Sequence, residues 1–145
     1  MSNEATLKGD LFKETIEQHH LSEYFPHVYI PEREMTVFQS KQILDNDRKI
    51  TITVSIDNTI YNKCSFLLLD LDEKHDSQTV LHVLNQLNNR YPNLKFILNP
   101  KNEIELEFMY IANSETFDDK LLLSLLRVTV EELSKGIFDY LLKHL

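Results

Sequence analysis

The residues best suited to chemistry lie in one short stretch, where four carboxylates flank a histidine. This stretch follows the apolar run 66–69 and contains Asp70, Asp72, Glu73, His75 and Asp76. Carboxylates beside a histidine can hold a divalent cation or perform acid–base catalysis. The spacing matches no calcium-binding loop, because the loop glycine and the closing glutamate are absent. Solvated and helix-capping acids also collect where a strand leads into a helix, so the stretch permits a metal-dependent enzyme without requiring one.

The other nucleophilic and metal-ligating residues form no catalytic pattern. The single cysteine, Cys64, falls inside an expected strand, which favours a buried thiol. The sequence contains no HExxH, CxxC or GxSxG motif. The histidines lie mostly near expected helix ends and show no ligand spacing: His19, His20, His27, His82 and His144. We therefore expect no catalytic residue, no bound metal and no cofactor.

Two asparagines on an expected helix are the best candidates for recognition. Asn85 and Asn88 are three residues apart and so share one face of that helix. Asparagine is a mediocre helix former, so the pair needs an explanation. The two amides could hydrogen-bond a partner or a ligand. Alternatively, they tie the helix to neighbouring strand or loop backbone.

Composition excludes several large functional classes. The chain has 145 residues, which suits a single domain over residues 1–145. Its two glycines, Gly9 and Gly136, stand too far apart for a glycine-rich phosphate-binding loop. With 15 basic and 23 acidic residues the net charge is −8, which disfavours nucleic-acid binding. No signal peptide or membrane-spanning apolar run is evident, so we expect a soluble cytoplasmic protein.

Runs of β-favouring residues and turn signals predict five strands, at about 35–44, 49–56, 60–69, 95–98 and 103–111. In the second strand, isoleucine and valine alternate with threonine and serine, which is typical of a half-buried strand. The last strand alternates three glutamates with apolar residues. Its pattern predicts exposed Glu103, Glu105 and Glu107 opposite buried Ile104, Leu106, Phe108 and Tyr110. The segment between Pro26 and Pro31 is expected to be an extended connection.

Three helices complete the expected order α-β-β-β-α-β-β-α. The first occupies the initial 25 residues and carries Leu7, Leu11 with Phe12, and Ile16 on its apolar side. The second begins at the N-cap Asp76-Ser77, with the apolar stripe Val80, Leu84, Leu87 and Tyr91, and stops before Pro92. We therefore expect an α+β fold, in which helices pack on a five-stranded, mainly antiparallel sheet.

The third helix extends to the C-terminus and begins at Ser114 or Thr116. Gly136 interrupts this helix near its end. The main apolar stripe is expected to contain Phe117, Leu121, Leu125, Val128, Leu133, Ile137 and Leu141. A second stripe contains Leu122, Leu126 and Leu133. Because one sheet face rarely needs so wide an apolar surface, we expect a homodimer formed through a helix or a sheet edge.

The middle helix also carries a family resemblance. Its residues Leu84-Asn85-Gln86-Leu87-Asn88 reproduce a Leu-Asn-x-x-Asn signature, and a strand, turn, strand and long helix follow. In these features the chain, from roughly Glu34 to Leu145, resembles the YbjN-type family of bacterial sensory-transduction regulators. The fold of that family is similar to that of class I type III secretion chaperones. The resemblance implies a bacterial, cytoplasmic and non-enzymatic role.

These observations favour a protein-binding module of chaperone-like or regulatory type, with an unidentified protein as its partner. Two alternatives remain open. One is a metal-dependent enzyme that uses the acidic stretch Asp70–Asp76. The other is a small-ligand sensor with a pocket between the sheet and the terminal helix.

Overall fold

The computed structural model describes residues 3–145, and within that range the chain forms one antiparallel sheet of six strands. Their spatial order is β1-β2-β3-β4-β6-β5. The strands are β1 (His27–Ile30), β2 (Met35–Ile43), β3 (Lys49–Ile56), β4 (Tyr61–Asp70), β5 (Lys95–Leu98) and β6 (Glu103–Ile111). The helices are α1 (Glu4–Gln18), α2 (Ser77–Arg90), α3 (Asp119–Glu132) and α4 (Phe138–His144), with a 3-10 turn η1 (Pro31–Arg33) and a π-helical turn η2 (Leu133–Ile137).

The α+β architecture is confirmed, but the expectation of five strands is wrong. The additional strand is β1, which was expected to be an extended connection between two prolines. It pairs with β2 in register from His27↔Phe38 to Ile30↔Met35 and forms one edge of the sheet. A four-residue edge strand with mainly exposed side chains shows no alternation of apolar and polar residues. Its pairing therefore depends on β2 and left no pattern in the sequence.

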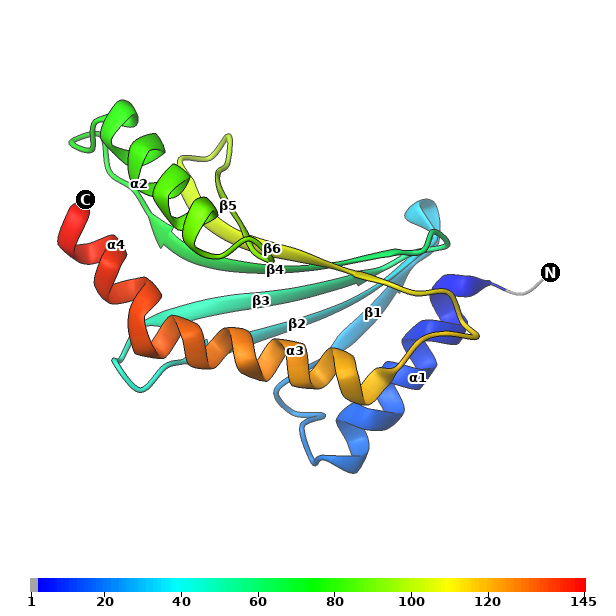
Figure 1. Cartoon of the computed structure of the whole chain (residues 1–145). Helices are drawn as coiled ribbons and strands as arrows, with labels where there is room; N and C mark the ends of the chain where they lie inside the picture. Colours follow the sequence, from blue (N-terminus) through cyan, green and yellow to red (C-terminus); the bar gives the residue numbers. More distant parts are fainter. Residues whose placement is uncertain (1–2) are drawn as a thin grey trace.

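The helices cover one face of the sheet. The strand registers place Ile52, Phe66 and Leu106 side by side, and all three side chains are buried. In Figure 1, α1 and α3 run along one side of the strands, and α2 lies beside β5. The alternate side chains, such as those of Thr53 and Ser65, point to the opposite face, and none of the helices described between residues 3 and 145 lies over it (Figure 1). We call that opposite face the uncovered face.

Helix α1 packs closely on β2. A side chain at Gly9 would meet Thr36 at 3.0 Å, so glycine allows the helix to approach the strand. One turn later, the ring of Phe12 meets that of Phe38 edge-on, with centroids 4.9 Å apart. Contrary to expectation, Leu7 is exposed. The buried side of the helix instead follows Phe12 and Ile16, because this is the side that faces the sheet.

The C-terminal helical segment begins later in the sequence than expected, and a different side of α3 is buried. Asp118 caps α3 by accepting a hydrogen bond from the Leu121 amide (3.0 Å). The buried stripe follows the second set of leucines: Leu122, Leu126 and Leu133. Leu121 and Val128, predicted to be buried, point outward, because the leucine-rich sequence offers two stripes and only packing on the sheet selects one. The expected interruption at Gly136 is the π-helical turn that joins α3 to α4.

A buried lysine ties α1 to the sheet at the end where β3 turns into β4. The Lys8 ammonium donates hydrogen bonds to the Thr59 carbonyl (2.6 Å) and to Asn62 Oδ1 (2.9 Å). The Asn62 amide in turn donates to the carbonyls of Tyr110 (2.9 Å) and Ala112 (3.2 Å). Burial lowers the pKa of Lys8, an effect that the charges of nearby carboxylates oppose. Three segments distant in the sequence are therefore held together by one polar network.

We expect the Lys8–Asn62 contact to appear as a coupling free energy. Asn62→Leu leaves the ammonium with one carbonyl partner, so unfolding free energy should fall by about 1.5–3 kcal/mol. In a Lys8→Met/Asn62→Leu double variant the unpaired charge is gone, and about 1–3 kcal/mol should be regained relative to additivity. Urea titrations of the four proteins measure both quantities. Strict additivity of the two changes would show that the network does not hold α1 in place.

Candidate functional site

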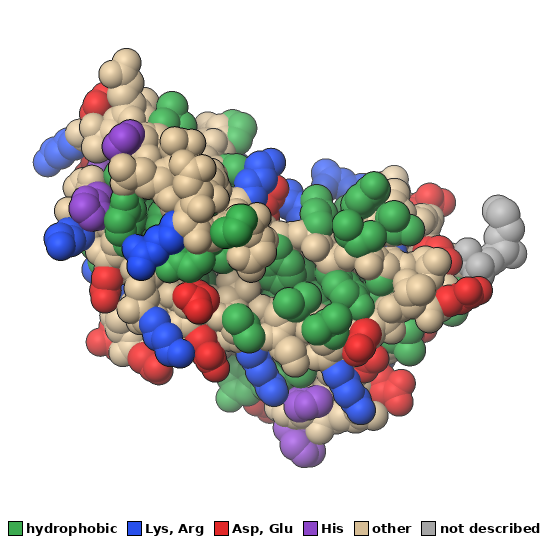
Figure 2. Space-filling view, viewed as in Figure 1, with side chains coloured by type: hydrophobic (Ala, Val, Ile, Leu, Met, Phe, Trp, Pro, Cys, Tyr) green, Lys and Arg blue, Asp and Glu red, His purple; other side chains and the backbone are tan. Residues whose placement is uncertain are grey.

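Apolar side chains gather on the uncovered face at the same end of the sheet. Tyr61 on β4 pairs with Ile111 on β6, and both are more than half exposed, at 54% and 61%. The neighbouring row across the sheet runs Val28, Val37, Ser55, Lys63 and Met109. We define the apolar strip as Val28, Val37, Tyr61, Met109 and Ile111. Ser55 and Lys63 lie between the two valines and Met109, and Val37 is half-buried. Hydrophobic side chains are visible in Figure 2 above this end of the sheet, near the β3–β4 turn.

The position of the apolar strip makes it a candidate recognition surface. Exposed apolar side chains that lie together, as those of Tyr61, Met109 and Ile111 do, commonly mark a site of interaction with another macromolecule. The strip lies on paired strands, so its side chains hold fixed positions relative to one another. The Lys8–Asn62 network braces β4 and β6 from the opposite face. The surface is therefore pre-formed, which reduces the entropic cost of binding.

The glutamate face of β6 is less exposed than its alternation predicts. Glu103 and Glu105 are half-buried and Glu107 is 8% exposed. Lys63 and Lys95, on the strands to either side, approach the Glu107 carboxylate at 3.3 and 3.6 Å. Their side chains both neutralise and cover it. Of the four apolar partners, Phe108 is half-buried, whereas Ile104, Leu106 and Tyr110 are buried as expected.

The structure separates the roles of the two asparagines. Asn88 Oδ1 accepts a hydrogen bond from the Phe96 amide (2.6 Å), and its Nδ2 donates to the Phe96 carbonyl (3.0 Å). This two-bond clamp ties α2 to β5 and corresponds to the alternative in which the amide contacts strand backbone. Asn85 is exposed on the surface of α2. Recognition of a partner or ligand through Asn85 stays a prediction.

The acidic stretch is spread over a turn and a helix cap. Asp72 Oδ1 lies 2.9 Å from His75 Nδ1, and Asp76 caps α2 through the Thr79 hydroxyl (2.9 Å). Those hydrogen bonds lower the pKa of Asp76. Within residues 3–145, no three His, Cys, Asp or Glu side chains come together in an arrangement that could hold a metal ion. Cys64 is buried in the core, and burial raises the pKa of its thiol, so the nucleophilic thiolate is disfavoured.

A cavity lies where the ligand-sensor alternative requires one. It has a volume of about 340 Å³, opens to solvent, and is lined by the loop after α1, by the sheet and by α3. Ile52, Leu126 and Val130 contribute apolar walls, and Arg127 and Glu131 also line it. Its position between the sheet and the C-terminal helices matches the sequence-based hypothesis. In the described part of the chain, no helix is long and apolar enough to cross a membrane.

Comparison with known proteins identifies a structural relative. No family model and no curated protein match this sequence. A chain in the crystal structure of the ExsC-ExsE complex has a similar fold, with a TM-score of 0.58 over 94% of this chain and 97% of that chain. At 11% sequence identity the likeness concerns the fold alone. That structure is a type III secretion chaperone complex, so the expected chaperone-like fold is confirmed.

The carboxyl pair at the end of β4 yields a pH-dependent prediction. Asp70 lies directly opposite Glu103. The hydrogen bond to Glu103 and its charge raise the pKa of Asp70. The folded chain therefore holds this proton more tightly than the unfolded chain, and the contribution of Asp70 to stability falls as pH rises through its pKa.

Asp70→Asn should accordingly raise the urea midpoint at pH 7, because it removes a like charge across the strand pair. The gain should shrink as pH falls through the raised pKa of Asp70 and should be absent below the ordinary Asp pKa of 3.8. Asp10→Asn, an exposed change on α1 of equal charge, serves as the control. Equal midpoints for the Asp70 variant and wild type at pH 7 would contradict the repulsion.

Proposed function

We propose that this chain is a non-enzymatic, chaperone-like module that binds a partner protein through the apolar strip on its uncovered sheet face. The observation that carries the proposal is the exposure of Tyr61, Met109 and Ile111 on a braced, pre-formed surface. The likeness to the ExsC-ExsE complex supports a fold that associates with other proteins. The Leu84–Asn88 signature supports assignment to the YbjN-type regulators, and with it a bacterial cytoplasmic setting.

The strip has the chemical character of a binding surface. Its exposed side chains are large and apolar or aromatic, and such residues supply most of the free energy at protein interfaces. Lys63, within the same rows, adds a charge whose alkyl stem extends the apolar area. The partner should therefore present an apolar surface to this end of the sheet.

A paired set of variants tests this function. Met109→Lys/Ile111→Lys places two charges on the strip, and we expect loss of a partner that wild type captures in cells of the source organism. Leu81→Lys/Leu142→Lys makes the same chemical change at exposed positions on α2 and α4. Titration with the purified partner should show affinity about ten-fold weaker or worse for the strip variant and near wild type for the control.

Unchanged affinity in the strip variant would contradict the assignment of the strip. If both variants lose the same amount of affinity for the partner, the cause is the added charge and not the apolar strip. Far-ultraviolet circular dichroism and urea midpoints confirm that each variant is folded. All four positions are exposed in this structure, so both pairs should keep the fold.

The proposal includes a homodimer formed through the outward stripe of α3. Leu121 and Val128 are exposed, and Leu125, half-buried, lies between them at helical spacing. Light scattering at tens of micromolar protein should report about twice 17.1 kDa. Leu121→Glu/Val128→Glu should return the mass to that of a monomer. A wild-type mass near 17.1 kDa at every concentration would overturn the dimer.

A second candidate function is favoured by the cavity between the sheet and α3. Its apolar walls and about 340 Å³ of volume suit a small apolar ligand. Native mass spectrometry of protein purified from its own host would detect such a molecule as a defined mass increment. Leu126→Ala widens the cavity and should change how much of that molecule the protein retains. It should leave partner binding through the apolar strip unchanged.

A further inference from the structure

The sheet divides at the end opposite to the apolar strip. β2 and β3 remain paired to Ile43↔Lys49, whereas the pairing of β3 with β4 stops at Thr51↔Leu67. β4 instead continues beside β6 to Asp70↔Glu103, after a shift in register between Leu67 and Leu69. Residues 49–50 of β3 therefore have a paired strand only on the β2 side, and residues 68–70 of β4 only on the β6 side. We call this opening between β3 and β4 the fork.

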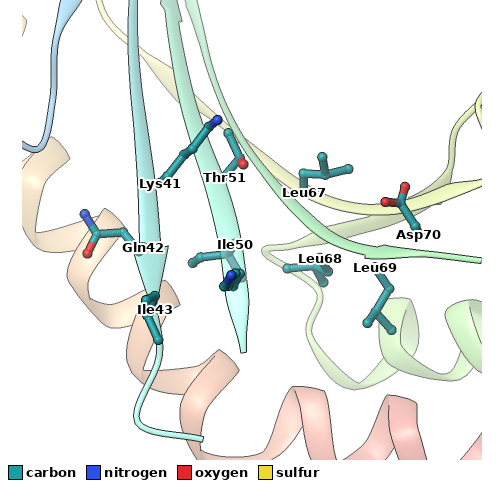
Figure 3. Close-up of a pocket in the computed structure, with 10 residues that line it drawn as sticks. Lys41, Gln42, Ile43, Ile50, Thr51, Leu67, Leu68, Leu69 and Asp70 are labelled. Carbon is teal, nitrogen blue, oxygen red and sulfur yellow. The ribbon is translucent and has the colours of Figure 1, made fainter. Parts of the chain in front are cut away.

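The fork contains a cavity of about 470 Å³. Figure 3 shows Leu67 and Asp70 on one side of β4, with Leu68 and Leu69 on the other. Ile50 and Leu68 are buried and form an apolar interior, and Ile43 at the rim is 68% exposed. Backbone edges that face each other without strand partners are a template for an added strand.

The β2–β3 side of the fork is positively charged. Lys41 and Lys49 line the cavity and are exposed. They lie on the same face, because Lys41 pairs with Thr51, two residues beyond Lys49 on the adjacent strand. Among residues 3–145, ion pairs at 4.0 Å or less involve Lys13, Lys63, Lys95, Lys135 and His75, but neither of these two lysines. Asp70 is the one carboxylate among the described residues that line the cavity, so the two lysines leave the cavity with a net positive charge, which favours an anionic ligand group.

We propose that the fork accepts an extended segment of a partner polypeptide in which an acidic side chain neighbours an apolar one. The backbone of that segment hydrogen-bonds to the free edges of β3 and β4, and its apolar side chain enters the cavity. Its carboxylate contacts Lys41 and Lys49. This inference rests on the proposed protein-binding function and adds a second contact, with a defined chemistry, at the far end of the sheet.

A pair of synthetic peptides tests the inference. The probe is a short fluorescent peptide in which glutamate alternates with valine, and its control has lysine in place of glutamate. Fluorescence anisotropy should show that wild type binds the acidic peptide and not the basic one. Lys41→Gln/Lys49→Gln should weaken binding of the acidic peptide about ten-fold or more, because two charge-assisted contacts are lost.

Lys120→Gln/Lys143→Gln is the matched control, with the same charge change at two exposed lysines on α3 and α4. It should bind the acidic peptide as wild type does. Amide hydrogen exchange at Lys49 and Asp70, whose amides alternate away from β2 and β6 and into the fork, should slow when the acidic peptide is bound. Absence of binding, equal affinity for both peptides, or equal weakening in both lysine double variants would overturn the fork site.

The two proposals fail in different ways. If the natural partner is lost by the Met109/Ile111 variant but kept by the Lys41/Lys49 variant, the apolar strip stands and the fork does not. If the acidic peptide binds at the fork while the Met109/Ile111 variant still binds the partner, the fork stands and the strip assignment is wrong. If both variants bind the partner more weakly than wild type does, the result supports both contacts.

Discussion

The structure depends on the antiparallel pairing of β3, β4 and β6. This pairing aligns Ile52, Phe66 and Leu106 in one row and directs them towards the helices. A slip of one residue in either pairing would turn that row to solvent and break contact with α1 and α3. Because side chains alternate between faces, the same register also determines which residues the helices leave uncovered. The candidate binding surface is thus a direct consequence of how the core is built.

The two ends of the sheet differ in the contacts that hold their strands together. At one end, the Lys8–Asn62 network and the close contact at Gly9 hold α1, β4 and β6 together beneath the apolar strip. At the other end, β3 and β4 separate and leave backbone edges without neighbours. A partner that spans the uncovered face would meet the apolar strip at one end and the charged opening of the fork at the other. This arrangement suits the binding of an elongated polypeptide better than that of a small substrate.

Local patterns in the sequence predict most of the elements. The alternation in β3 and the capped stripe of α2 involve neighbours along the chain, so they can be recognised without the fold. β1 could not be recognised, because its four residues gain their conformation from pairing with β2. The burial of Glu107 depends on lysines from two other strands. The choice between the two leucine stripes of α3 likewise depends on the sheet against which that helix packs.

The candidate site was the least predictable feature, for the same reason. The five residues of the apolar strip come from four strands, and only the register brings them together. The sequence instead drew attention to Asn88, which contacts backbone within the fold, and to acids that occupy a turn and a helix cap. Polar residues close together in the sequence attract notice more readily than apolar residues that only the fold assembles.

Site-specific photo-crosslinking in cells of the source organism tests the central claim most directly. A photoreactive amino acid would replace Met109 on the apolar strip or, as a control, Leu81 on the outer side of α2, which is similarly exposed. Irradiation should join position 109, but not position 81, to a distinct second protein. The absence of an adduct at position 109, an adduct there with another copy of this chain only, or the same adducts at both positions would contradict partner binding through the uncovered face.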